Sequence, residues 1–162
     1  MAAEITGPRV AAQGQPGEVH TTSKNALNSI AYGYGADGTP AEYIYLKGVA
    51  STIVGSVVTY DELGVSTLIV ANAIGPVAVA TAITDATTEF GWYAISGVHE
   101  VDTVANSAAD VGVGRETTNG KVGDGRAAGD QIANWVQRDA TTTAAVVTHQ
   151  FYRPYVDDFQ GA

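Results

Sequence analysis

Residues 89–97 read EFGWYAISG and place three large aromatic rings within four positions of a chain rich in Ala, Val, Thr and Gly. Successive side chains of a β-strand point to opposite faces of its sheet. If this stretch is extended, Phe90 and Trp92 share one face and Tyr93 takes the other. We expect Phe90 and Trp92 to fill a core of small residues, and Tyr93 to face a neighbouring molecule.

The chain on both sides of this stretch has the pattern of short strands separated by turn residues. Runs such as EYIYLKGV, GSVVTY, STLIVAN and VAVATAI are rich in β-branched and aromatic residues, which favour strands. Turn residues at 61–64 separate two of these runs, and Gly75-Pro76 is expected to break the chain before VAVATAI. The pattern predicts a mainly β fold, a small antiparallel β-barrel or sandwich over residues 42–152.

Three local features complete the predicted domain. The glycine-rich segment 112–130 contains Asn119-Gly120, a strong signal for a two-residue hairpin turn. Two last strands are expected around residues 131–138 and 143–152. A short helix is the alternative for the first of them, because Ile132, Trp135 and Val136 would share a helical face.

The ends of the chain differ from this central region. Residues 1–41 are rich in Gly and Pro and show no sustained period, which predicts an extended N-terminal arm with one short helical turn around residues 23–30. A disordered tail is the alternative for this segment. Its apolar anchors are Leu27, Ile30 and Tyr32. Residues 153–162, RPYVDDFQGA, are expected to leave the fold at Pro154 as a short C-terminal tail.

Charge and composition narrow the possible partners. The net charge is −9, and no Lys or Arg occurs between Lys47 and Arg115, so the surface should repel phosphate backbones and nucleic acid is not an expected partner. There is no Cys, so neither a disulfide nor a Cys-ligated metal site is possible. No apolar run has the length of a spanning helix, so no membrane partner is expected. The first residues lack the pattern of a secretory signal, which indicates synthesis in the cytoplasm.

Each candidate motif for catalysis, cofactor binding or metal binding is explained at least as well by a structural role. Gly114 and Gly120-Lys121 do not have the spacing of a phosphate loop. The three histidines, His20, His99 and His149, form no ligand pair, and His99 and His149 fall in expected strands. We therefore expect no enzyme, no cofactor and no metal.

Five strings occur in this order along the chain: YIYLKGVASTIVGSVVTYDE, ANAIGPVAVATAI, FGWYAISG, AAGDQI and RPYVDD. Together they resemble a family of tailed-phage virion proteins, the head decoration or capsid cement proteins. The resemblance covers roughly residues 43–158 and does not extend to the arm. The segment 103–122 matches the family least, which leaves the role of the glycine-rich hairpin open.

The resemblance implies a protein on the outer surface of a phage capsid. There it would bind the major capsid protein, and other copies of itself, and reinforce contacts between capsid subunits. The arm and the tail are the expected fastening elements, since an extended segment can bind by strand addition. The expected interface residues are Leu27, Ile30, Tyr32, Tyr93, Tyr152, Arg153, Tyr155 and Phe159.

A carbohydrate-binding or adhesion module of a head fibre or tail-associated protein is the alternative. It would require exposed aromatic side chains on a sheet face, for which Trp92, Tyr93 and Trp135 are the candidates.

Overall fold

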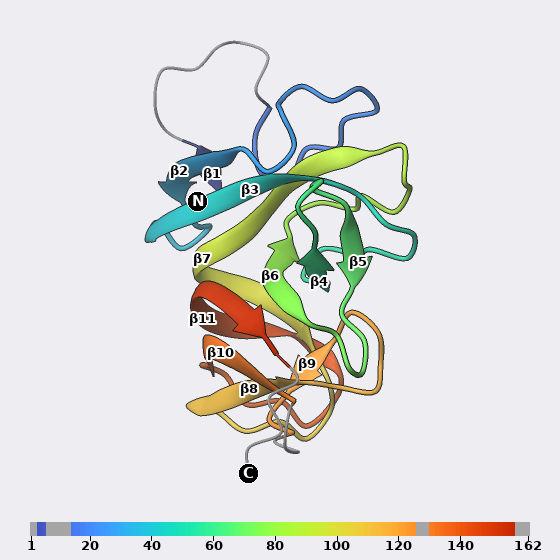
Figure 1. The fold of residues 1–162 in the computed structure, drawn as a ribbon. Helices are drawn as coiled ribbons and strands as arrows, with labels where there is room; N and C mark the ends of the chain where they lie inside the picture. The colour runs from blue at the N-terminus through green and yellow to red at the C-terminus, as the bar shows by residue number, and fades with distance from the viewer. Residues whose placement is uncertain (1–2, 6–13, 126–129, 158–162) are drawn as a thin grey trace.

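The computed structural model describes residues 3–5, 14–125 and 130–157, and these form one all-β domain (Figure 1). The strands are β1 (Glu4–Ile5), β2 (Ile30–Tyr34), β3 (Pro40–Lys47), β4 (Val57–Tyr60), β5 (Ser66–Leu68), β6 (Gly75–Ala80), β7 (Phe90–Thr103), β8 (Val111–Arg115), β9 (Val122–Gly123), β10 (Gln131–Gln137) and β11 (Ala145–Val156). The described residues contain no helix. The predicted mainly β fold is confirmed.

The long strand β7 organises the whole domain. It pairs antiparallel with β3, β6 and β11, and its end pairs in parallel with β9. In the lower half of Figure 1 the pairings β7–β11, β11–β10, β10–β8, β8–β9 and β9–β7 close a ring of strands. In the upper half β3, β7, β6, β4 and β5 close a second ring through the bridge between Lys47 and Val65. Two small barrels therefore share β7.

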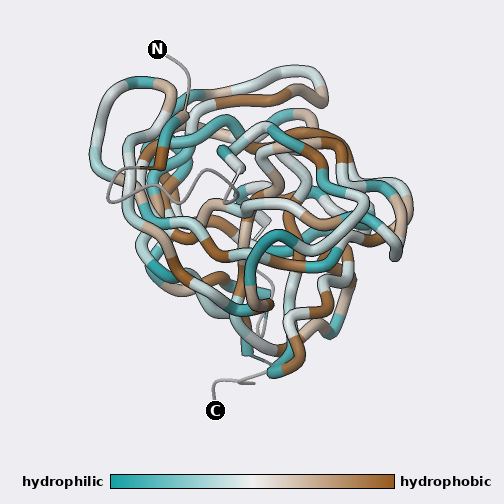
Figure 2. Tube along the Cα trace, turned by 90° about the horizontal axis from the view of Figure 1, so that it is seen from above, coloured by the Kyte–Doolittle hydropathy of each residue, from teal (hydrophilic) through white to brown (hydrophobic). Residues whose placement is uncertain are grey.

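Both faces of β7 are buried over residues 91–96, because each face belongs to a different core. Trp92 and Ala94 pack in the larger cluster, whereas Tyr93 and Ile95 pack in a second cluster with residues of β3, β4 and β6. The predicted burial of Trp92 is correct, and Phe90 packs half-buried against the same cluster. The hydropathy changes repeatedly along the strands (Figure 2), as expected when successive side chains face different environments.

The predicted N-terminal arm is instead largely part of the domain. His20 is buried, and its backbone exchanges two hydrogen bonds with Phe90. Residues 30–34 form β2, which pairs with β3, and β1 pairs with β2. The expected helical turn around residues 23–30 is absent from the structure, which has non-helical turns there. Low apolar content misled the prediction, because backbone hydrogen bonds hold these residues on the sheet.

The predicted C-terminal boundary also lies too early. β11 continues through Pro154 to Val156, and both of these residues are buried. A bulge makes this possible: the β10–β11 pairing slips between Ala133 and Trp135, and Arg153 has a φ of 44°. A bulged residue needs no ladder hydrogen bond, so proline is tolerated there. Residues 158–162, including Phe159, lie outside the described part.

Three smaller expectations have mixed outcomes. Residues 131–137 form a strand rather than a helix. Gly75-Pro76 opens β6 instead of breaking the chain before it. Gly120 has the positive φ expected of a turn, but the connection between β8 and β9 is longer than the two-residue hairpin that the sequence predicts.

Candidate functional site

The eight tyrosines divide into an interior and an exterior group. Tyr43, Tyr45 and Tyr93 are fully buried and Tyr60 is half-buried. The exposed members all lie on β2 and β11, and they are Tyr32, Tyr34, Tyr152 and Tyr155. Exposed tyrosines gathered on two strands identify one candidate binding face.

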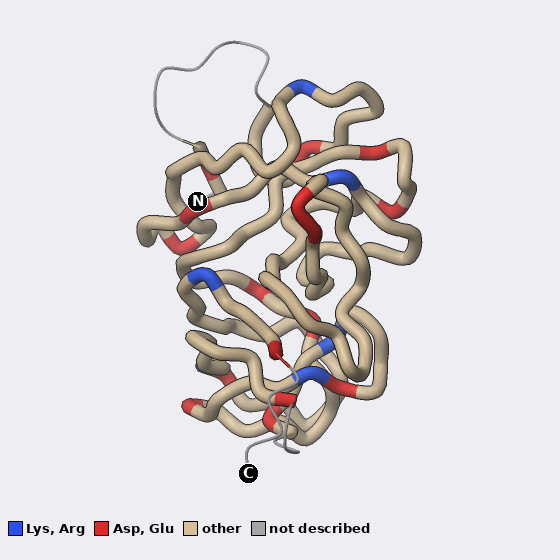
Figure 3. Tube along the Cα trace, in the orientation of Figure 1, with Lys and Arg blue, Asp and Glu red and all other residues tan. Residues whose placement is uncertain are grey.

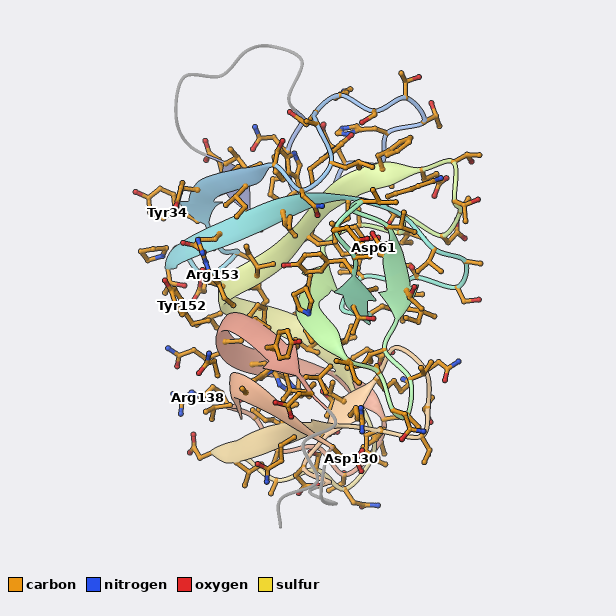
Figure 4. The ribbon with its side chains drawn as sticks, in the orientation of Figure 1. Tyr34, Asp61, Asp130, Arg138, Tyr152 and Arg153 are labelled. Carbon is orange, nitrogen blue, oxygen red and sulfur yellow. The ribbon has the colours of Figure 1, made fainter. Side chains whose placement is uncertain are left out.

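Three of these tyrosines line a groove of about 620 Å³, which we call the tyrosine groove. Its walls and floor come from β2, β3, β7 and β11, and include Tyr32, Tyr34, Glu42, Gly97, Gln150 and Tyr152. Figure 4 shows Tyr34, Arg153, Tyr152 and Arg138 following one another along one side of the molecule.

The strand register explains why the groove has a tyrosine on each side. Tyr32 pairs with Glu42, Glu42 with Ser96, and Ser96 with Tyr152, so these residues form one row across four strands. Three interstrand spacings separate the ends of the row by about 14 Å along the sheet. Both outer tyrosines are 61% exposed, whereas Ser96 in the middle is buried. The row therefore gives two aromatic walls and a low floor.

Gly97 keeps the floor open. Its φ is 107°, a conformation that residues with a side chain rarely adopt. A Cβ at this position would lie 3.0 Å from both the Ala41 Cβ and the Pro40 carbonyl oxygen. The close approach of β3 to β7 at this point thus depends on a glycine.

His99 supports the floor from behind. Its Nε2 donates a hydrogen bond to the Ser96 carbonyl oxygen at 3.0 Å, and its ring stacks on Phe151 at a centroid distance of 5.5 Å. Burial lowers the pKa of His99, so the imidazole is neutral near pH 7. Ser96 and Phe151 both line the groove, and His99 fixes the position of both.

The bulge in β11 presents two adjacent side chains on the outside. Strand alternation would turn either Tyr152 or Arg153 inward, but both are exposed because Arg153 has left-handed backbone geometry. The Arg153 Nε donates to the Glu42 Oε2 at 2.8 Å, and this hydrogen bond raises the pKa of Arg153. The guanidinium thus lies against Glu42, which pairs with Tyr32 in the row.

The charges beside the groove are paired with each other. Arg153 contacts Glu42, and Arg138 contacts both Asp110 and the Gln150 side chain. Elsewhere acidic residues outnumber the few Lys and Arg (Figure 3). The tyrosine groove is therefore close to neutral in an acidic protein.

The structure brings together only some of the interface residues that the sequence predicts. Tyr32 and Tyr152 line the groove, Arg153 lies beside it, and Ile30 is exposed on β2. Tyr155 is exposed but does not line the groove.

Two predicted interface residues lie in the interior. Leu27 is partly buried against the larger core, and Tyr93 is fully buried, with its hydroxyl hydrogen-bonded to Thr84. The prediction that Tyr93 faces a neighbouring molecule is wrong, because its side chain packs inside the domain against residues of β3, β4 and β6. Trp92 and Trp135, candidates for carbohydrate contact, are also buried, so all three predicted aromatics are unavailable.

Sequence reasoning missed Tyr34, Glu42, Ser96 and Gln150. A usable signal exists for Tyr34, because IAYGY alternates and puts Tyr32 and Tyr34 on one face. Gln150 shares a strand with Tyr152, and Glu42 pairs with Tyr32 between the consecutive strands β2 and β3. Ser96 lies near Tyr152 only through pairing between distant strands, which the sequence does not specify.

The buried histidines have structural partners. The Trp135 Nε1 donates to the His149 Nδ1 at 2.8 Å, and the His149 Nε2 lies 2.9 Å from the Thr103 hydroxyl. His20 bonds to the Tyr45 hydroxyl at 2.8 Å. Within the described ranges, no three His, Asp or Glu side chains come close enough together to hold a metal ion.

Comparison with protein-family models, with curated proteins and with solved structures found no significant match for this chain. In the described part of the chain, no helix combines the length and the hydropathy needed to cross a lipid bilayer.

Proposed function

We propose that the protein decorates the outer surface of a phage head, binds there through the tyrosine groove, and stabilises contacts between major capsid subunits. It acts in this proposal as a binding protein and not as an enzyme. The observation that carries the proposal is the gathering of exposed tyrosines and Arg153 around one groove. Tyrosine and arginine are enriched in protein interfaces and among the residues that dominate binding energy.

The location of the resembling strings supports the same proposal. Four of the five strings fall on β3, β4, β6 and β7, which belong to the upper ring, and on the end of β11 beside the groove. The fifth, AAGDQI, reaches the start of β10, and its first residues lie outside the described part. The segments that resemble virion decoration proteins thus include strands on both sides of the candidate interface.

The closed arrangement of strands suits a protein that must bear load. Closure leaves few open strand edges, which limits uncontrolled edge-to-edge association. A rigid groove also loses little conformational entropy on binding, so more of the contact energy appears as affinity. Each bound copy would then raise the work needed to separate two capsid subunits.

The experiment is co-sedimentation of the purified protein with phage heads that lack it. The unaltered protein should saturate heads at a copy number comparable to that of the capsid subunits. The double variant Tyr32→Ala/Tyr152→Ala should lose most binding, with an apparent Kd raised at least about a hundredfold, as expected when two interface anchors are removed.

Leu63→Ala is the matched control, because Leu63 is 67% exposed in the turn between β4 and β5, outside the groove. It should bind as the unaltered protein does. Saturation by the double variant, or a copy number that fits only the tail, would overturn the proposal.

An adhesion module that binds carbohydrate is the second candidate. The concave groove between two exposed tyrosines favours it, because sugar rings also pack on aromatic faces. This candidate would be supported instead by a neutral oligosaccharide that binds the unaltered protein and does not bind the Tyr32→Ala/Tyr152→Ala variant.

A further inference from the structure

The tyrosine groove offers an occupant side chains rather than a free strand edge. At the floor, β3 is paired with β2 and β7, and β7 is paired with β3 and β11. Backbone groups there are already hydrogen-bonded, so a partner cannot add a strand along the floor. The row from Tyr32 to Tyr152 instead runs across the strands, which sets the direction of the occupant.

The hydrogen-bonding groups at the floor are unevenly available. Three acceptors already receive hydrogen bonds: the Ser96 Oγ from the Glu42 amide at 3.0 Å, the Glu42 Oε2 from Arg153, and the Gln150 Oε1 from Arg138. The donors that remain include the Gln150 side-chain amide and the hydroxyls of Tyr34 and Tyr152, for which the described residues provide no acceptor. The groove therefore suits an occupant rich in acceptors and poor in donors.

Proline-rich peptide has this composition. Each proline carries a carbonyl acceptor and no N–H donor, and the polyproline II helix that it forms needs no internal hydrogen bonds. Sugars carry hydroxyls that donate as well as accept, whereas the Ser96 Oγ, the Glu42 Oε2 and the Gln150 Oε1 each already receive a hydrogen bond. The paired charges of Arg153 and Glu42 also favour an uncharged occupant.

We propose that the tyrosine groove binds a proline-rich segment of a protein partner in the polyproline II conformation, laid across β2, β3, β7 and β11. This inference rests on the proposed function, in which the partner is the major capsid protein. Proline rings pack on the exposed faces of Tyr32 and Tyr152, and tyrosine hydroxyls donate to peptide carbonyls. At about 3.1 Å per residue, roughly five residues span the two tyrosines.

The test uses the full isotope-labelled chain and three probes: a ten-residue polyproline peptide, a Gly/Ser peptide of equal length, and maltohexaose. Each probe is titrated while backbone amide shifts are recorded. Polyproline should shift the amides of Gly33, Gly97 and Tyr152, and the Gly/Ser peptide and maltohexaose should not. Tyr152→Ala should raise the Kd for polyproline by about tenfold, as expected for the loss of one aromatic anchor.

Two further variants keep the test decisive. Tyr155→Ala is the matched control, since Tyr155 is an exposed tyrosine on the same strand but outside the groove, and it should leave the Kd unchanged. Tyr152→Phe keeps the ring and should retain most of the affinity. The inference is overturned if polyproline leaves these amides unmoved, if either other probe binds there as well as or better than polyproline, or if Tyr155→Ala weakens binding equally.

Head binding is measured in parallel to separate the two proposals. A protein that saturates heads but ignores polyproline contradicts this inference alone. A protein that binds polyproline in the groove but does not bind heads contradicts the decoration proposal and leaves the chemistry of the groove in place.

Discussion

Buried and exposed tyrosines lie on neighbouring strands of this protein and differ in how their hydroxyls are used. Tyr45 is fully buried, and its hydroxyl accepts a hydrogen bond from the Lys24 amide and bonds to His20. Tyr152 is 61% exposed, and the described residues provide no partner for its hydroxyl. The Tyr45 hydroxyl is committed to the fold, whereas the Tyr152 hydroxyl is available to a partner.

The two groups are physically connected. The buried Tyr43 donates its hydroxyl hydrogen to the backbone oxygen of Tyr34 at 2.8 Å, so an interior tyrosine holds the strand that carries an exterior one. Burial raises the pKa values of Tyr43, Tyr45 and Tyr93, so all three remain protonated and can donate at any ordinary pH. The core therefore positions a strand that carries exposed tyrosines of the groove.

The largest expected effect belongs to the interior, at His149. Burial lowers the pKa of His149 to about 4 from an ordinary value of 6.5, although Asp139 opposes this shift. The unfolded chain therefore binds a proton between pH 6.5 and 4 that the folded protein excludes. The free energy of unfolding should fall by about 3 kcal/mol as the pH drops through this window.

Urea denaturation of the unaltered protein and of His149→Gln at several pH values measures this effect. Glutamine can still accept from Trp135 and donate to Thr103, but it does not titrate. The other groups, His99 among them, are common to both proteins, so the difference between the two pH profiles isolates His149. Parallel profiles between pH 6.5 and 4 would contradict the prediction.

The next effect lies where the interior and the groove meet, at Gly97. Gly97→Ala forces a side chain into a backbone with positive φ and against Ala41 and Pro40. We expect a loss of about 2 kcal/mol in the free energy of unfolding, from backbone strain and crowding together. Gly112→Ala is the control, because a Cβ there has no atom within 4 Å, and thermal unfolding of both variants gives the comparison. Equal stability of the two variants would show that the close approach of β3 to β7 at the groove floor does not require a glycine at position 97.

The smallest effect compares one hydroxyl inside with one outside. Tyr45→Phe leaves buried His20 and the Lys24 amide without their partner and should cost about 1–2 kcal/mol of stability. Tyr152→Phe should change stability by less than about 0.5 kcal/mol, as for an exposed surface substitution. Equilibrium unfolding in urea measures both, and a cost at Tyr152 that matches the cost at Tyr45 would remove the distinction between the two groups.

The sequence was enough to predict the fold class and most strands, because alternation and turn residues are local signals. It could not reveal that Tyr93 is covered, since β3 and β4, which pack against it together with β6, are distant from it in the chain. Pro154 looked like an end because the bulge at Arg153, which accommodates it, depends on pairing with β10.

The candidate site was predictable only in part. Tyr32, Tyr152 and Arg153 could be proposed from their residue types and positions near the ends of the chain. Their assembly with Glu42 and Ser96 depends on the register between four strands, and register follows from packing as a whole.

Hydroxyl-radical footprinting tests whether the tyrosine groove is the surface that meets the phage head. Oxidation rates of individual side chains are compared between the free protein and the protein bound to heads. We predict strong protection of Tyr32, Tyr34 and Tyr152 on the head and unchanged oxidation of Leu63. Unchanged rates at the three tyrosines, with protection elsewhere on the surface, would contradict the account.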